Sequence, residues 1–272
     1  MALKICALAS GSKGNCIFIS GGNTSILIDA GISFSAICNG LKRVGSDISE
    51  ISAVLVSHEH SDHVRSLSRV AEAITVYVHE NAREAIGGRV CAAMPCGEEV
   101  FGDKGFTIGG IDITPFRVPH DAAYPVGFSF EAEGGKISVA TDLGYMTRGV
   151  LNNLKGSDVV LLEANHDERL LKTGRYPEAL KRRILGRNGH LSNEISALTV
   201  CELLAFGGTH TVILGHLSEE NNRPELAYNT VAEYAKRSGA HAGKDFVLEV
   251  ATQRDISATV ECKTNISGVK RI

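Results

Sequence analysis

Short segments of alternating apolar and polar residues open the chain, at residues 4–10, 15–22 and 25–31. This period-two pattern is typical of half-buried strands, and Gly, Ser and Asn separate the segments, so we predict three antiparallel strands joined by short turns. Residues 34–45 then show helical spacing and end at a glycine, and residues 51–58 form the continuous apolar run that a strand covered on both faces requires. From this point we predict alternating β and α elements.

The later part of the chain continues in the same two patterns. Strand character is found at residues 74–80, 106–118, 126–142, 158–167, 211–218 and 246–252, and helical spacing at residues 62–73, 81–88, 192–208 and 223–239. We expect residues 246–252 to be the final strand, and Gly134-Gly135 to form a hairpin turn. Both halves run from antiparallel strands into β/α alternation without a low-complexity linker. The pattern therefore predicts an α/β protein with two sheets packed face to face and helices outside, as a single domain over residues 1–272.

The composition is that of a folded globular protein, since 43 % of the 272 residues are hydrophobic and 22 % are charged. The formal net charge of −3 gives no support to nucleic-acid binding, so a polyanion site must come from local clustering of basic residues. The seven cysteines include no C-x-x-C pair, and we expect reduced, mostly buried thiols. The first residues lack the features of a signal peptide, and no apolar run is long enough to span a bilayer. We therefore predict a cytoplasmic protein without membrane contact.

Four potential metal ligands stand in one short turn after the continuous apolar run, in the sequence SHEHSDHV at residues 57–64. Alternate residues of an extended segment point the same way, so His58 and His60 can bind one cation. Asp62 and His63, at the start of the next helix, face a second cation. A lone histidine is more often a satisfied core or surface side chain, but packing does not explain a cluster this dense. The turn therefore predicts a metal centre with further ligands from elsewhere.

The motif H-x-H-x-D-H after a strand resembles that of the metallo-β-lactamase superfamily, whose four-layer αββα sandwich also matches the predicted order of elements. The resemblance implies that His120 completes the first metal site, that His216 completes the second, and that Asp142 bridges the two. It also implies that Asp29 supports the histidine loop from below, although an ordinary turn at a strand end explains Asp29 equally well. Two divalent metal ions are expected, zinc or manganese, with iron as a further option.

Two cations that share a water molecule lower its pKa and polarise the bond under attack, so hydrolysis is the predicted reaction class. The sequence does not determine which kind of bond is hydrolysed, because thioesters, lactams and phosphodiesters are all cleaved on this fold. Two segments offer substrate ligands. The loop LASGSKGNC holds Ser12, Lys13 and Asn15, although a flexible hairpin loop is the simpler interpretation, and LLEANHD ends a strand with Asn165 and His166.

A third segment, KRRILGRNGHLSNE, combines positive charge with a histidine. It places Arg183 and Arg187 before His190, and Ser192 or Asn193 as the N-cap of the following helix. A basic run is more often a solvated face than a binding site. Here it leads to a helix N-terminus, whose free N–H groups and dipole favour an anion. We therefore expect these residues to bind phosphate.

These segments, together with LGHLSEENNRPE, look like those of the WalJ/YycJ family of metallo-β-lactamase-fold hydrolases, and the likeness covers nearly the whole chain. The resemblance implies a metal-dependent phosphodiesterase with 5′–3′ exonuclease activity. It also implies nucleic acid as the substrate, with DNA preferred over RNA.

The leading hypothesis is a binuclear phosphodiesterase in which Asp62 accepts a proton from the attacking water. His190 or His166 would donate a hydrogen bond or a proton to the phosphate or the leaving oxygen. His190 is expected to bind no metal, with a capping or packing role as the alternative. The nearest rival is a hydrolase of cyclic or nucleotide phosphodiesters or of thioesters. A regulatory protein with structural metals fits less well, because structural zinc sites are closed and four-coordinate. The sequence predicts no oligomeric state.

Overall fold

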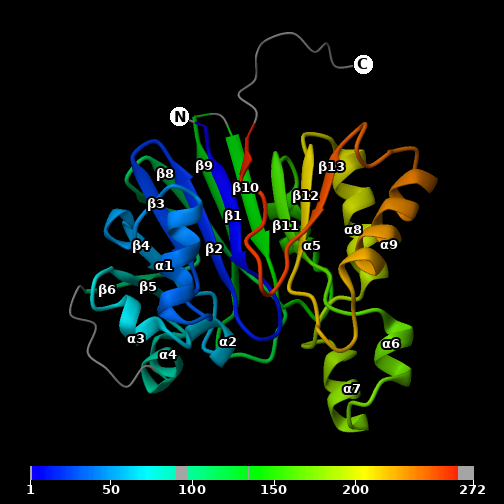
Figure 1. Ribbon diagram of the computed structural model, residues 1–272, viewed down its shortest axis with the longest axis horizontal. Coiled ribbons are helices and arrows are strands. Elements are labelled where there is room, and N and C mark those ends of the chain that lie inside the picture. The colour runs from blue at the N-terminus through cyan, green and yellow to red at the C-terminus, as the bar shows by residue number, and fades with distance from the viewer. Residues whose placement is uncertain (1, 90–96, 134, 263–272) are drawn as a thin grey trace.

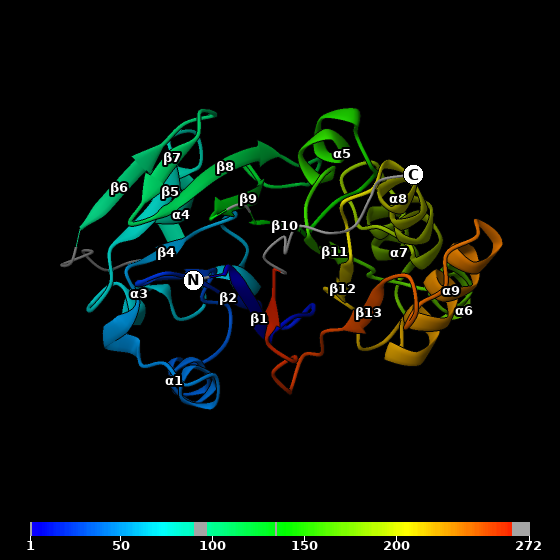
Figure 2. The ribbon, with the colours of Figure 1, turned by 90° about the horizontal axis from the view of Figure 1, so that it is seen from above.

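The computed structural model describes residues 2–89, 97–133 and 135–262. Two β-sheets lie face to face, and helices cover both outer sides (Figures 1 and 2). Cys91, Cys96 and Gly134, the first residue of the expected hairpin turn, lie outside the described residues.

Sheet A is built around the N-terminal strands. Its strands, in spatial order, are β14 (Val260–Glu261), β1 (Lys4–Ala9), β2 (Cys16–Gly21), β3 (Thr24–Ile28), β4 (Ala53–Leu55), β5 (Val76–His79) and β6 (Glu98–Phe101). β1, β2 and β3 pair antiparallel, as predicted, whereas the pairs from β3 to β6 are parallel.

Sheet B repeats this plan with later strands. In spatial order they are β13 (Val247–Val250), β12 (Thr211–Gly215), β11 (Val159–Glu163), β10 (Gly135–Ala140), β9 (Val126–Ala132), β8 (Ile111–Arg117) and β7 (Phe106–Ile108). The pairs from β7 to β10 are antiparallel, and those from β10 to β13 are parallel. The predicted change from antiparallel strands to β/α alternation is therefore present in both sheets.

Three apolar layers hold the sheets and helices together, and the central layer between the sheets includes Phe128 and Phe130. Sheet A is covered by α1 (Phe34–Arg43), the 3₁₀ turn η1 (Ile48–Glu50), α2 (Ser61–Val64), α3 (Leu67–Val70) and α4 (Arg83–Arg89). Sheet B is covered by α5 (Arg148–Leu154), α8 (Asn193–Phe206) and α9 (Pro224–Arg237). This order of layers confirms the predicted αββα sandwich. None of the helices in the described ranges combines the length and apolar character needed to cross a membrane.

The structure differs from the prediction in several places. β14 follows the segment expected to be the final strand, returns to sheet A and pairs with β1. The helix expected at residues 62–73 is broken into α2 and α3, because the Ser66 N–H donates to the Ala30 carbonyl. The predicted basic run lies partly in α7 (Glu178–Ile184), which with α6 (Glu168–Thr173) extends beyond the sheets at the lower right of Figure 1. The short elements β6 and α5 also escaped prediction.

Candidate metal centre

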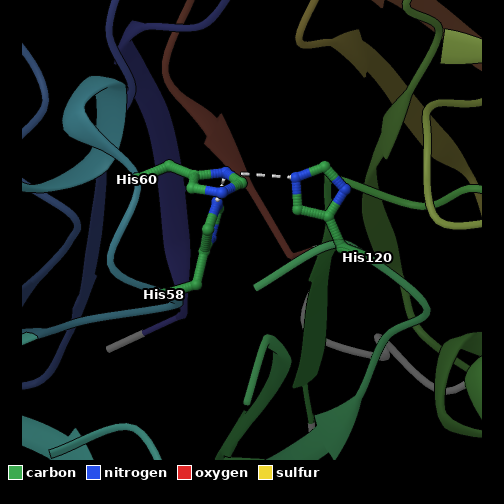
Figure 3. A group of neighbouring side chains, drawn as sticks. All are labelled: His58, His60 and His120. Atoms are coloured by element: carbon green, nitrogen blue, oxygen red, sulfur yellow. Dashed lines mark hydrogen bonds between the residues drawn. The ribbon is translucent and has the colours of Figure 1, made fainter. Parts of the chain in front are cut away.

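Three histidine side chains meet where the two sheets face each other. His58 and His60 lie in the loop after β4 of sheet A, and His120 follows β8 of sheet B (Figure 3). His58 Nε2 is 3.1 Å from His60 Nδ1, which is 3.3 Å from His120 Nε2. A tetrahedral ion bound at about 2.0–2.1 Å holds its ligand nitrogens about 3.3 Å apart. The three nitrogens are therefore spaced to share one cation.

A second group lies beside the first and consists of Asp62, His63 and His216. Asp62 Oδ2 is 3.5 Å from His63 Nε2 and 3.6 Å from His216 Nε2. Burial alone would raise the pKa of Asp62, but the adjacent His216 and His63 outweigh this effect and hold the pKa below its ordinary value. The group therefore offers an anionic oxygen and two imidazole nitrogens to a cation.

Asp142 lies between the two groups. Its Oδ1 is 3.6 Å from His120 Nε2 and 3.4 Å from His216 Nε2, and its Oδ2 is 3.3 Å from His63 Nε2. Asp142 Oδ2 and His216 Nε2 are buried and have no hydrogen-bond partner among the described residues. Buried polar atoms are nearly always paired, so these two atoms fit a bound cation. The structure thus brings together all seven residues predicted as ligands, in an arrangement that fits divalent metal ions.

The backbone is strained at three positions around this centre. Asp29, Asp142 and His216 have φ angles of 63°, 60° and 56°, in the left-handed region that favours glycine. Each of the three residues follows the end of a strand. Strained residues of this kind persist only where the surrounding structure holds them in place, and they are found most often at functional sites.

Asp29 lies beneath the histidine loop. Its Oδ1 accepts a hydrogen bond from the Ser57 N–H at 2.8 Å, and its Oδ2 is 2.7 Å from His63 Nδ1. A carboxylate on one imidazole nitrogen fixes the tautomer and leaves the other nitrogen free to bind a metal. Asp29 therefore orients both the loop and His63.

Gly31 allows the segment after Asp29 to touch α2. A Cβ atom at this position would lie 1.6 Å from the Asp62 carbonyl oxygen. We expect Gly31→Ala to displace Asp62, to lower the free energy of unfolding by about 1–3 kcal/mol and to reduce the bound metal per chain. Denaturant unfolding and elemental analysis measure these effects. Gly110→Ala is the control, because a Cβ there meets nothing within 4 Å; equal results for both variants would refute the expected clash.

Glu163, at the end of β11, is a fully buried carboxylate that the sequence-based predictions missed. Its Oε1 is 2.7 Å from His190 Nδ1 and 3.0 Å from His216 Nδ1. Its Oε2 accepts hydrogen bonds from the backbone N–H groups of Leu143 and Leu191. Burial favours the neutral acid, but His190 and His216 outweigh it and lower the pKa of Glu163 to about 2. The available signal was one charged residue ending the apolar strand VVLLE.

His190 lies against the ligand groups, with its ring stacked on that of His216 at a centroid distance of 5.2 Å. Its side chain is 13 % exposed, and its Nδ1 is engaged by Glu163. Nε2 is therefore the nitrogen left to meet a substrate. Ligand atoms of His190, Asp142, Glu163 and His216 also lie within 4.8 Å of one another, so the absence of a metal ligand role for His190 stays a prediction.

Hydrogen bonds connect helix α7 and the following loop, which carries His190, to the loop that carries His120. Arg183 donates two hydrogen bonds to the carboxylate of Asp121, at 2.6 and 2.9 Å. His120 Nδ1 is 3.1 Å from the Gly189 carbonyl oxygen. Arg183, expected to bind phosphate, is thus paired with a carboxylate and positions the loops.

Asn15 and Asn165 also differ from their expected role as substrate ligands, because both are buried. Asn15 Nδ2 is 3.1 Å from His63 Nε2. Asn165 Nδ2 donates to the His216 carbonyl oxygen at 2.9 Å. Both amides therefore support the segments that carry ligands rather than face the solvent.

Ser192 and Asn193 are likewise buried, so neither is placed to bind phosphate directly. Ser192 is the N-cap of α8, and Asn193 exchanges hydrogen bonds with Asn222. The N-cap position of Ser192 is one of the two that were predicted, and short polar residues at a helix start satisfy backbone or cap groups as readily as they bind an anion. Ser12 and Lys13 are exposed, as expected, but Lys13 forms an ion pair with Glu219.

His166 is 1 % exposed, and neither ring nitrogen has a hydrogen-bond partner in the described part of the chain. Burial lowers the pKa of His166 to about 4, so its ring is neutral at pH 7. A neutral imidazole can donate a hydrogen bond but has no excess proton to give. Of the two histidines considered for proton donation, His190 has the carboxylate partner that this role requires.

The fold and the ligand groups define a metal-dependent hydrolase of the metallo-β-lactamase class. The family model of the beta-lactamase superfamily domain matches residues 24–217. The exodeoxyribonuclease YycJ of Bacillus anthracis is 35 % identical over 255 residues, covering 91 % of this chain and 95 % of that protein. The exodeoxyribonuclease WalJ of Streptococcus pneumoniae is 34 % identical over 253 residues, covering 90 % and 93 %. The chain therefore belongs to the beta-lactamase superfamily and, within it, to the WalJ/YycJ family.

A solved structure shares the fold at much lower sequence identity. The metallo-beta-lactamase fold protein YhfI from Bacillus subtilis superposes with a TM-score of 0.70 at 15 % identity. The match covers 96 % of this chain and 100 % of that chain. The sandwich is thus common to proteins whose sequences have diverged widely.

Proposed function

We propose that this protein is a phosphodiesterase with two divalent cations that acts on DNA as a 5′–3′ exonuclease. The observation that carries the proposal is the Glu163–His190 pair beside two adjoining groups of metal ligands. A metal-dependent phosphodiesterase uses cations at the phosphate and a proton donor at the leaving oxygen. This arrangement offers ligands for the cations and a histidine for the proton. The names of the relatives at 34 % and 35 % identity support DNA as the substrate.

Zinc or manganese suits the ligands, which combine imidazoles with carboxylates, and iron is a further option. Burial lowers the pKa values of His58 and His120, which favours the neutral imidazoles that metal binding requires. Asp142 outweighs burial at His63 and His216 and raises their pKa values, so a cation bound there must displace protons. The proposed location is the cytoplasm, and the proposed folding unit is one domain over residues 1–272.

Three side chains have separate roles in the proposed reaction. When bound, cations of this kind lower the pKa of water and stabilise negative charge on phosphate oxygens. Asp62, whose side chain is 22 % exposed, accepts the proton of the attacking water. His190 donates from Nε2 to the leaving oxygen, while Glu163 holds Nδ1 and stabilises the protonated ring.

A substrate panel tests the proposal. Wild-type protein supplied with zinc or manganese is incubated with single- and double-stranded DNA, RNA, a cyclic nucleotide, a thioester and a β-lactam. We expect DNA to be shortened from its 5′ end, and Asp62→Ala to be slower by about 10²- to 10⁴-fold, because this variant loses the proton acceptor. Asp255→Ala, which removes a carboxylate that is 81 % exposed, is the control and is expected to cleave at the wild-type rate.

The panel also separates the alternatives. Turnover of the thioester alone would exclude a phosphodiesterase. Cleavage of RNA or the cyclic nucleotide without cleavage of DNA would keep the phosphodiesterase and exclude the proposed substrate. Shortening from the 3′ end would reverse the proposed polarity.

A further inference from the structure

An exposed aromatic side chain with an arginine over its ring lies beside the metal centre. Tyr145 is 38 % exposed, and the guanidinium carbon of Arg187 lies 4.9 Å from the centre of its ring. Tyr145 stands three residues after Asp142, and Arg187 three residues before His190. Three residues of extended chain span at most about 11 Å. Both members of the pair are therefore held close to residues of the centre.

The two loops that carry this pair are packed tightly against each other. A Cβ atom at Gly144 would lie 2.1 Å from the Arg187 carbonyl oxygen, so only glycine permits this approach of the backbones. The Gly144 N–H also donates to the Pro119 carbonyl at 2.8 Å, next to His120. The backbones that carry the pair are therefore positioned before any ligand arrives, which reduces the entropy lost on binding.

We propose that the Tyr145–Arg187 pair is a stacking platform for a nucleobase of the DNA strand whose phosphate reaches the metal centre. Every base has a π-face, so an aromatic ring binds a strand without reading its sequence, and an arginine adds a cation–π contact and charge for the phosphates. Arg187 was expected to bind phosphate together with the N-terminus of helix α8. In this proposal it still binds the substrate, but through its contact with the stacked base. This inference rests on the proposed function and adds a contact to it.

Exposure of an aromatic ring is not sufficient on its own, since single apolar side chains are common on protein surfaces. Phe206 offers the comparison, because it is 61 % exposed and Lys155 lies 5.6 Å from its ring centre. Phe206 ends α8, however, whereas the centre lies near the start of that helix. The position beside the ligands is what distinguishes Tyr145.

The test compares Tyr145→Ala, Tyr145→Phe and Phe206→Ala on single-stranded DNA, either intact or with one abasic site placed at successive positions. We expect Tyr145→Ala to raise KM by about tenfold, because a stacked base loses its partner, with a smaller change in kcat. Tyr145→Phe, which keeps the ring, and Phe206→Ala are expected to retain the wild-type KM. At one position, an abasic site should raise the wild-type KM to the value of Tyr145→Ala and leave that variant unchanged.

The outcomes separate this inference from the proposed function. If Tyr145→Ala cleaves DNA with the wild-type KM, the stacking platform is refuted, whereas the proposed exonuclease activity is unaffected. The platform would also be refuted if, at every position, the increase in KM caused by an abasic site added to the increase caused by Tyr145→Ala. Failure of the wild-type protein to cleave any DNA with either metal would instead remove the proposed function itself.

Discussion

Asp142→Gly is expected to lose most of its bound metal and to cleave DNA about 10³-fold more slowly or worse, yet to unfold at no lower temperature than the wild type when both are metal-free. Asp142 is the carboxylate that contacts both groups of ligands, so its loss weakens both. Glycine also adopts the φ of 60° found at this position without the strain that aspartate bears. Elemental analysis, oligonucleotide cleavage and thermal unfolding in the presence of a chelator measure the three effects.

The matched control is Glu133→Gly, because Glu133 also has a positive φ, of 46°, but lies in the turn after β9. This variant is expected to keep the metal content and cleavage rate of the wild type. An Asp142→Gly protein with full metal content and normal cleavage would show that Asp142 does not hold the cations.

His190→Ala is expected to keep its metals but to cleave DNA about 10²- to 10⁴-fold more slowly, because the leaving oxygen loses its proton donor. The size of the loss should depend on the leaving group. A p-nitrophenyl phosphodiester releases a stable anion that needs no proton, so its cleavage should fall much less than that of DNA. The measurement is the ratio of wild-type to variant rates for each substrate, together with the metal content.

His210→Ala serves as the control for this prediction. His210 is paired with Asp158 at 3.5 Å beside the start of β12, so it lies at the other end of the strand from His216. We expect this variant to retain both rates. Loss of metal in His190→Ala would instead identify His190 as a ligand, and equal losses with both substrates would indicate a structural role.

Much of the fold was predictable because hydrophobic periodicity depends on which faces of an element are buried. The antiparallel strands, the covered strand β4 and the helices α1, α8 and α9 all followed from that pattern. β14 is only two residues long, so it has no period to detect. The break between α2 and α3 depends on Ala30, a residue distant in sequence that local spacing does not reveal.

The residues around the metal centre divide in the same way. His58 to His63 were evident because several ligand types stand together in one turn. Glu163 was missed because a buried carboxylate has meaning only through its partners, which here come from other strands and loops. The basic segment was overestimated because charge in a sequence does not reveal pairing: Arg183 binds Asp121, and the Lys181 ammonium donates to the Lys172 carbonyl.

The return of the chain to sheet A also has a consequence for biosynthesis. The Ser257 N–H donates to the Ala7 carbonyl and the Ser10 N–H to the Thr252 carbonyl, and Gln253 accepts from the Lys13 N–H across 240 positions. At about 5–20 residues per second, a ribosome needs on the order of ten seconds or more to add these partners. During that time the edge of β1 is open to pairing with other chains, so the nascent protein is exposed to aggregation until synthesis has passed β13.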